Sequence, residues 1–206
     1  MDQSPSTRRR DNRRQRILTI ALDAFLENGY ANTSMSAIAA LVGGSKGTLY
    51  NHFSTKEELF LACIQSFIES HSQQTFSAID EGGEPTRVLG NFCRFFIAAI
   101  TSKTDLALTR LVIAEAGRFP AIGRTLYQSG PVPGVARLAT YIAQAMAAGQ
   151  LRRDDAERAA LLLFSLCQSR IYQEVLFNVS KPPGAKKIAA EADAAVATFM
   201  VLYGIR

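Results

Sequence analysis

The sequence predicts an all-α fold, and three observations support this prediction. Apolar residues recur every three or four positions along most of the chain, as on the buried face of a helix. Breaks rich in glycine and proline, such as Gly130-Pro131-Val132-Pro133-Gly134, separate the helical segments. No segment shows the apolar–polar alternation of a β-strand over a useful length. At 206 residues the chain is long enough for one large or two modest domains.

The start of the chain is strongly basic. The formal net charge is +5, and most of the excess lies in the first sixteen residues, where six arginines stand against Asp2 and Asp11. Such a segment suits a polyanionic partner, and the alternative is a solvated tail that aids solubility. We expect residues 1–12 to form a basic, flexible arm.

Three helices are expected after the arm. The first covers about 13–28, and Gly29 stands where it can end that helix. Thr33 or Ser34 can cap a short second helix. The third opens at Ser45 or Lys46, after a glycine pair. Two short helices joined by a tight, glycine-bearing turn predict a helix-turn-helix.

The third helix, in the segment 45–53, carries surplus polar groups on its outside. Leu49 and Phe53 are four residues apart and can share a buried face. Gly47 costs about 1 kcal/mol relative to alanine in a helix, but it lets the backbone approach a bulky surface such as DNA. The other side chains of the segment include a lysine, hydroxyls and an amide, which suit phosphate oxygens and base edges.

The fourth helix begins at Ser54-Thr55-Lys56-Glu57, which predicts a capping box between Ser54 and Glu57. We expect this helix to continue to about residue 71. Lys56 places a cation near a helix N-terminus, where the helix dipole disfavours it. We predict that a DNA phosphate resolves this conflict.

The rest of the chain predicts helices at 85–101, 105–116, 120–129, 133–148, 154–178 and 185–203. The segment 154–178 is apolar on nearly all sides, and 185–203 is rich in alanine. Together they suit a two-fold, four-helix interface between two chains. The alternative is that both helices close the core of a monomer.

Other kinds of chemistry have little support in the sequence. We expect Cys63, Cys93 and Cys167 to be buried thiols, with a redox-sensing pair as the alternative. His52 and His71 show no metal-ligand spacing. No nucleophile motif or phosphate-binding glycine loop stands out, so neither an enzyme nor a cofactor is expected. No apolar run is long enough to span a membrane and no signal-peptide core follows the basic start, so we expect a cytoplasmic protein.

Two stretches resemble a known family. Thr33 to Ala39, followed by Gly43 and by Ser45 to Leu59, resembles the DNA-binding domain of TetR-family transcriptional regulators, over about residues 13–60. Arg110 to Pro120 and the downstream Tyr127 to Gly130 resemble the AefR-like type of C-terminal domain in that family. The resemblance implies a homodimeric, ligand-responsive repressor that binds a palindromic operator in double-stranded DNA and is released by a small molecule. The alternative is an architectural DNA-binding protein without an effector.

The resemblance also implies roles for particular residues. It places DNA-binding in 13–60, and effector binding and dimerisation in 61–206. Major-groove positions would be Lys46, Gly47, Thr48, Tyr50, Asn51 and His52, and phosphate contacts would be Thr33, Ser34 and Lys56. His52 could instead brace Phe53.

Aromatic and polar residues of the middle helices could line an effector cavity. The candidates are Phe92, Phe96, Glu115, Phe119, Tyr127, Phe164, Gln168, Arg170 and Tyr172. They favour an apolar or aromatic effector. The alternatives are that the aromatic residues are ordinary core and that Arg170 pairs with Glu174.

Overall fold

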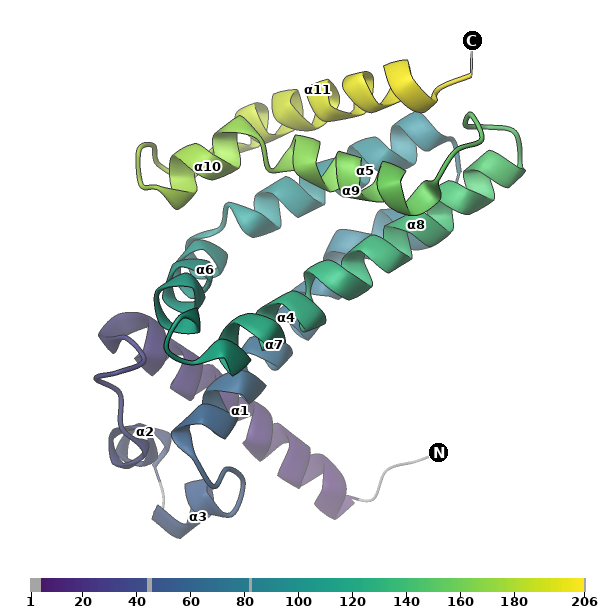
Figure 1. Ribbon diagram of the computed structural model, residues 1–206. Helices are drawn as coiled ribbons and strands as arrows, with labels where there is room; N and C mark the ends of the chain where they lie inside the picture. The colour runs from purple at the N-terminus through teal and green to yellow at the C-terminus, as the bar shows by residue number, and fades with distance from the viewer. Residues whose placement is uncertain (1–4, 44–45, 82, 206) are drawn as a thin grey trace. The chain divides into compact units, whose positions relative to one another are not determined.

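The computed structural model describes residues 5–43, 46–81 and 83–205, and it confirms the all-α prediction (Figure 1). The helices are α1 (Pro5–Asn28), α2 (Met35–Val42), α3 (Lys46–Tyr50), α4 (Lys56–Glu81), α5 (Pro85–Ile100), α6 (Lys103–Ala116), α7 (Pro120–Ser129), α8 (Pro131–Ala147), α9 (Ala156–Cys167), α10 (Arg170–Leu176) and α11 (Ala185–Tyr203). Among the described residues, extended pairing is limited to one isolated bridge, between Leu151 and Gly204. No described helix combines the length and the apolar character needed to cross a membrane.

The first helix starts earlier than the sequence predicts. α1 begins at Pro5, so residues 5–12 are helical where a flexible arm was expected. Proline fits the first turn of a helix, and the arginines that follow are good helix formers. The rest of the expected arm, residues 1–4, lies outside the described residues. The arginines of this segment are therefore carried on a helix.

Two further boundaries differ from the prediction. α4 continues to Glu81, beyond the expected end near residue 71. The single helix expected over 154–178 is two helices, because Ser169 has φ −68° and ψ −101°, outside the helical region. The Ser169 hydroxyl donates to the Leu166 carbonyl at 2.9 Å. Neither glycine nor proline marks this bend in the sequence.

The capping interactions of α4 are shifted by one residue from the prediction. The Thr55 hydroxyl accepts a hydrogen bond from the Glu58 amide at 3.0 Å. The Glu58 carboxylate accepts from the Ser54 amide at 2.8 Å and from the Ser54 hydroxyl at 2.6 Å. Because α4 begins at Lys56, Thr55 occupies the cap position and Glu58, not Glu57, is the acidic partner.

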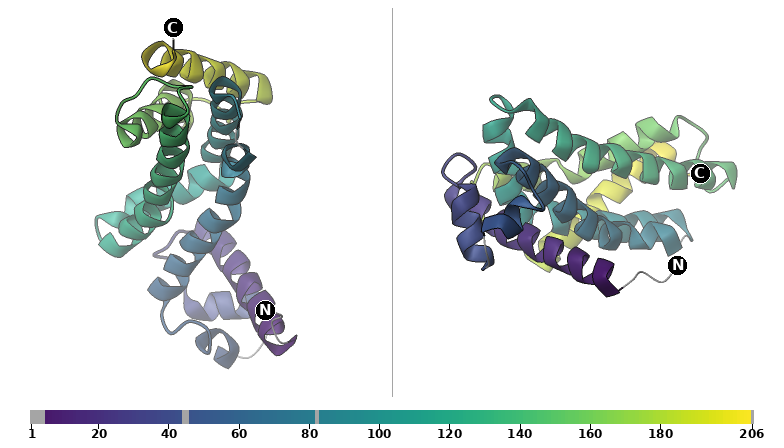
Figure 2. Two further views of the ribbon diagram at one scale, coloured as in Figure 1. Left: turned by 90° about the vertical axis from the view of Figure 1, so that its right-hand side faces the viewer. Right: turned by 90° about the horizontal axis from the view of Figure 1, so that it is seen from below.

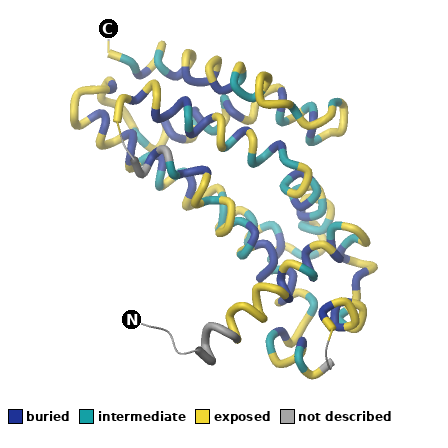
Figure 3. The backbone as a smooth tube through the Cα atoms, turned by 180° about the vertical axis from the view of Figure 1, so that it is seen from behind, coloured by how far each residue is buried: buried dark blue, intermediate teal, exposed yellow. Residues whose placement is uncertain are grey.

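The chain forms two compact units, which combine segments distant in sequence. The first comprises Met1–Glu69 and Ala107–Tyr127, and the second comprises Ser70–Leu106 and Gln128–Arg206. Buried positions recur at helical spacing along the helices of both units (Figure 3). In the first unit, Leu108, Val112 and Ile122 of α6 and α7 share one core with α1 to α4. The region 107–127 therefore packs with the helix-turn-helix, although the sequence predicts it in the effector domain.

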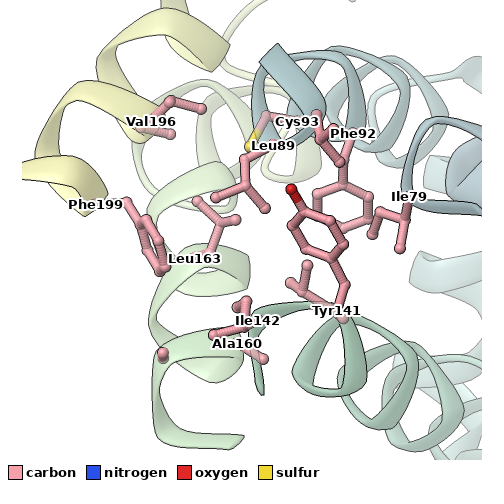
Figure 4. Packing of buried hydrophobic residues seen from close by; sticks show 14 of the residues in the cluster. Ile79, Leu89, Phe92, Cys93, Tyr141, Ile142, Ala160, Leu163, Val196 and Phe199 are labelled. Carbon is pink, nitrogen blue, oxygen red and sulfur yellow. The ribbon is translucent and has the colours of Figure 1, made fainter. Parts of the chain in front are cut away.

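The second unit has its own core. α11, yellow in Figures 1 and 2, packs along α5 and α9. The core side chains include Leu89 and Phe92 of α5, Leu163 of α9 and Phe199 of α11 (Figure 4).

The three cysteines are buried and unbridged, as predicted. Burial raises the pKa of Cys63 to about 12, so its reactive thiolate form is scarce near neutral pH.

Candidate nucleic-acid interface

The helix-turn-helix is built by local capping. The Ser34 hydroxyl accepts from the Ala37 amide at 3.1 Å and caps α2. Gly43 ends α2 with φ 70°, a conformation that favours glycine. Helical hydrogen bonding continues past α3, since the Phe53 amide donates to the Leu49 carbonyl at 3.0 Å. These hydrogen bonds therefore hold α3 and the turn after it together as one ordered segment.

α3 presents the two faces that the sequence predicts. The side chains of Leu49 and Phe53 are 0% and 2% exposed and belong to the core of the first unit. On the other side, Gly47 and Asn51 are exposed, and Tyr50 is 47% exposed. The backbone at Gly47, the Tyr50 phenol and the Asn51 amide are thus exposed, while the two buried side chains hold α3 in the core. The side chain of Lys46, another predicted contact, lies outside the described residues.

α1 contributes arginines to this surface. A hollow of about 440 Å³ is lined by Arg10 and Arg13 of α1 and by Asn51 and His52 after α3. The Arg13 guanidinium donates to the Thr48 hydroxyl at 3.4 Å. Arg10 and Arg13 were absent from the residues that the resemblance assigned to the site. The signal that could have found them is their three-residue spacing within the basic segment.

His52 lies at the edge of this basic group and is partly buried. Its pKa is lowered, first by burial and then by the positive charges of Arg10, Arg13 and Arg14. Its ring centroid is 6.3 Å from that of Phe53. The imidazole therefore adjoins both Phe53 and the hollow, and the free protein holds it largely neutral near pH 7.

Thr33 and Lys56 have partners inside the protein. The Thr33 side chain is buried, and its hydroxyl lies 2.8 Å from the Gly29 carbonyl and 3.2 Å from that of Ala24. The Lys56 ammonium donates to the Tyr30 carbonyl at 2.7 Å, and it lies 4.4 Å from the centroid of the Tyr30 ring. In the free protein, the Lys56 cation at the start of α4 thus stabilises the turn that follows α1.

Three of the predicted effector-binding residues meet in the second unit. The Phe164 ring stands edge-on to Phe96 and Phe92, with centroid distances of 4.8 and 5.5 Å, and Phe92 stacks on Phe96 at 5.8 Å. Phe76, which the sequence reasoning missed because α4 was expected to end before it, lies 5.3 Å from Phe92. A Cβ atom on Gly134 of α8 would lie 3.4 Å from both Phe76 and Phe164. We call these four phenylalanines the aromatic cluster.

The other predicted effector residues lie elsewhere. Glu115, Phe119 and Tyr127 belong to the first unit, where Phe119 packs edge-on against Tyr30 at 5.2 Å and Tyr127 is exposed. Arg170 pairs with Glu174 at 3.8 Å, as the alternative reading held, and with Glu191 at 3.1 Å. Gln168 is exposed and Tyr172 is partly buried.

A helix-turn-helix that is anchored in the core, with an outward polar face and arginines beside it, is typical of a DNA-binding protein. The family model "Bacterial regulatory proteins, tetR family" matches residues 17–63. The model "AefR-like transcriptional repressor, C-terminal domain" matches residues 87–205, more than half of the chain. The chain belongs to the TetR family, whose members are DNA-binding transcriptional regulators and not enzymes.

Individual relatives agree with this assignment. A putative TetR-family regulator from Mesorhizobium loti is 30% identical with a TM-score of 0.88, over 98% of this chain and 100% of that one. The flavonoid-responsive regulator FrrA is 32% identical with a TM-score of 0.77, over 95% and 99%. The transcriptional activator FasR of Mycolicibacterium smegmatis is 43% identical over 30% of this chain, and the match spans only 28% of FasR.

Proposed function

We propose that this protein is a homodimeric repressor that binds a palindromic operator and leaves it when a small aromatic molecule binds the second unit. The observation that carries the proposal is the two-faced α3, which has a buried anchor of Leu49 and Phe53 beneath exposed polar groups. Two such helices, one from each protomer, would enter successive major grooves about 34–36 Å apart. A role on chromosomal DNA would place the protein in the cytoplasm.

The proposed DNA contacts divide into two kinds. Thr48, Tyr50 and Asn51 read base edges, and the absence of a side chain at Gly47 lets the backbone approach them. Ser34, exposed at the start of α2, meets a phosphate, which fixes the register without reading sequence. Thr33 and Lys56 act indirectly, since their polar groups hold α1, α2 and α4 together.

The proposed dimer interface is the outer face of α9 and α11. Leu161 of α9 is 49% exposed, and Val201 and Leu202 of α11 are 80% and 46% exposed. Exposed alanines at positions 190, 194 and 197 share the outer face of α11 and would allow close helix approach. Apolar side chains in such a patch favour burial against a second copy.

The proposed effector site is the aromatic cluster. Edge-on and stacked rings offer π surfaces to a flat aromatic molecule, and the relative FrrA is flavonoid-responsive by name. The four rings pack against one another, so the ligand would have to displace at least one of them. A 100-fold release of DNA needs about 2.7 kcal/mol of preference for the released conformation.

Selection of bound sequences from a random DNA pool, with the complex sized by light scattering, tests the proposal. A palindrome held by a dimer, and released by members of a flavonoid and phenol panel, is the expected result. A pool that is not enriched at moderate salt, despite tight binding at low salt, would instead favour the effector-independent architectural protein.

A further inference from the structure

We propose that the hollow lined by Arg10, Arg13, Asn51 and His52 binds one phosphodiester group of the DNA backbone. We call it the phosphate hollow. It lies partly outside the family match, which begins at residue 17, so the first turns of α1 add a binding site of their own. The inference rests on the proposed function for the DNA partner, but its test does not require a specific operator.

The geometry brings donors from two elements to one place. Arg10 and Arg13 are three residues apart on α1 and line the same hollow of about 440 Å³ as Asn51 and His52. A guanidinium carries five N–H donors in a planar fork that matches phosphate oxygens, and the 3.4 Å contact with Thr48 uses one donor of Arg13. The amide of Asn51 adds a neutral donor. The four lining side chains therefore all carry N–H groups that can donate hydrogen bonds.

The charges around the hollow favour an anion. None of its four lining residues is a carboxylate, and the positive charges of Arg10, Arg13 and Arg14 all act on His52. Asn51 and Thr48, which belong to the proposed base-reading surface, adjoin the same arginines. A phosphate bound here would thus flank the base pairs that this surface reads.

Arg13 would link the two kinds of contact. Its guanidinium lies within hydrogen-bonding distance of the Thr48 hydroxyl. A DNA phosphate held by Arg13 would therefore fix the position of α3 relative to the DNA backbone. Affinity from this site is independent of sequence, but it depends strongly on salt.

The experiment uses the full-length protein, the selected operator and a duplex of arbitrary sequence. Arg10→Gln keeps the Arg13–Thr48 contact, R10Q/R13Q removes both guanidinium groups, and Arg16→Gln removes an exposed arginine of α1 that does not line the hollow. Neutral methylphosphonate linkages, placed one at a time along each operator strand, locate the phosphate. Thermal melting of each variant checks folding.

For R10Q/R13Q we expect the slope of log affinity against log salt to fall by about 0.9 per hollow, hence about 1.8 for a dimer, on both duplexes. One methylphosphonate position per half-site should weaken binding of the wild type and of R16Q but not of R10Q/R13Q.

The inference is overturned if R10Q/R13Q and R16Q give the same slope and the same methylphosphonate profile. Loss of base preference with an unchanged slope would also overturn it, because the arginines would then only position α3. Failure to select any operator contradicts the proposed function alone, since the slope on arbitrary DNA still tests the hollow.

Discussion

Lys56 shows how a side chain that looks like a DNA contact can serve the fold. Its position at the start of α4 was visible in the sequence, and a phosphate was the predicted partner. In the free protein the ammonium contacts the Tyr30 carbonyl and ring, and the phosphate contact stays a prediction. These partners lie 26 residues away in the sequence, in the turn that follows α1, so no local pattern could reveal them.

Replacing Lys56 by methionine should therefore lower stability more than DNA binding. Loss of a hydrogen bond from a charged donor predicts a decrease of about 1–3 kcal/mol in the free energy of unfolding, measured by urea denaturation. The salt dependence of DNA affinity should match that of Lys103→Met, a control at an exposed lysine. If the free energy of unfolding were unchanged and the salt dependence of DNA affinity became weaker, Lys56 would instead act mainly as the phosphate contact that the sequence predicts.

His52 should make DNA binding depend on pH. In the free protein its pKa lies below 6.5, because burial and Arg10, Arg13 and Arg14 disfavour the imidazolium. A nearby DNA phosphate would offset the arginines and raise this pKa, so the complex would take up a proton. Affinity should then increase as pH falls from about 8 towards the pKa in the free protein.

Fluorescence anisotropy titrations across this pH range measure the effect, with His52→Gln as the comparison. The substitution should flatten the pH dependence, because glutamine keeps a polar side chain but does not titrate. If wild type and variant changed in parallel between pH 6 and 8, another group would be responsible.

At the scale of elements, the sequence predicted the segments that have their own capping signals. Ser34, the positive φ of Gly43 and the Ser54–Glu58 region define the starts of α2, α3 and α4, which fell within a residue or two of the prediction. The end of α3 did not, since it lies at Tyr50 and not at residue 53. At the bend between α9 and α10, the Ser169 hydroxyl donates to the Leu166 carbonyl and Arg170 pairs with Glu191 of α11. The second of these is a tertiary contact, which periodicity does not report.

α4 is the element that both units share, with residues up to Glu69 in the first and Ser70 onward in the second. We expect it to carry the effector signal. Glycine at the exposed positions Glu69 and Gln73 should loosen the helix by about 1 kcal/mol per site without opening the core. The expected result is retained operator binding with a weaker response to the effector.

The matched control replaces the same two residues by alanine, which keeps the helix stiff. Effector titrations of the preformed operator complex compare the two variants. Equal release of DNA from both would exclude α4 as the route of the signal.

At the scale of the whole molecule, the proposed dimer can be tested at one side chain. Val201 is 80% exposed in the protomer, so Val201→Arg should leave folding intact while placing a charge in the apolar interface. We expect a monomer by light scattering and at least a tenfold loss of operator affinity, because each half-site would bind alone.

Phe177→Arg is the control, since this residue is also exposed but lies outside α9 and α11. A V201R protein that stayed dimeric would place the interface on another face.

The division of the chain into units was the least predictable feature. The sequence suggested DNA binding up to residue 60 and effector binding after it, whereas 107–127 packs with α1 to α4. Leu108, Val112 and Ile122 have the helical spacing of any core residue, and spacing does not state which core they join. The aromatic cluster was predicted except for Phe76, because α4 was expected to end near residue 71 and the helix continues to Glu81.

The packing of Phe119 against Tyr30 has a consequence for building hybrid sensors, in which the DNA-reading half of one regulator is fused to the ligand-sensing half of another. A crossover in the interval between the two family matches, 64–86, would pair a native Tyr30 with a foreign residue at position 119. The core of the hybrid would then be mismatched at the contact between positions 30 and 119, which supports the DNA-binding segment. Successful fusions of this regulator should therefore transplant two pieces together, the N-terminal DNA-binding segment and 107–127.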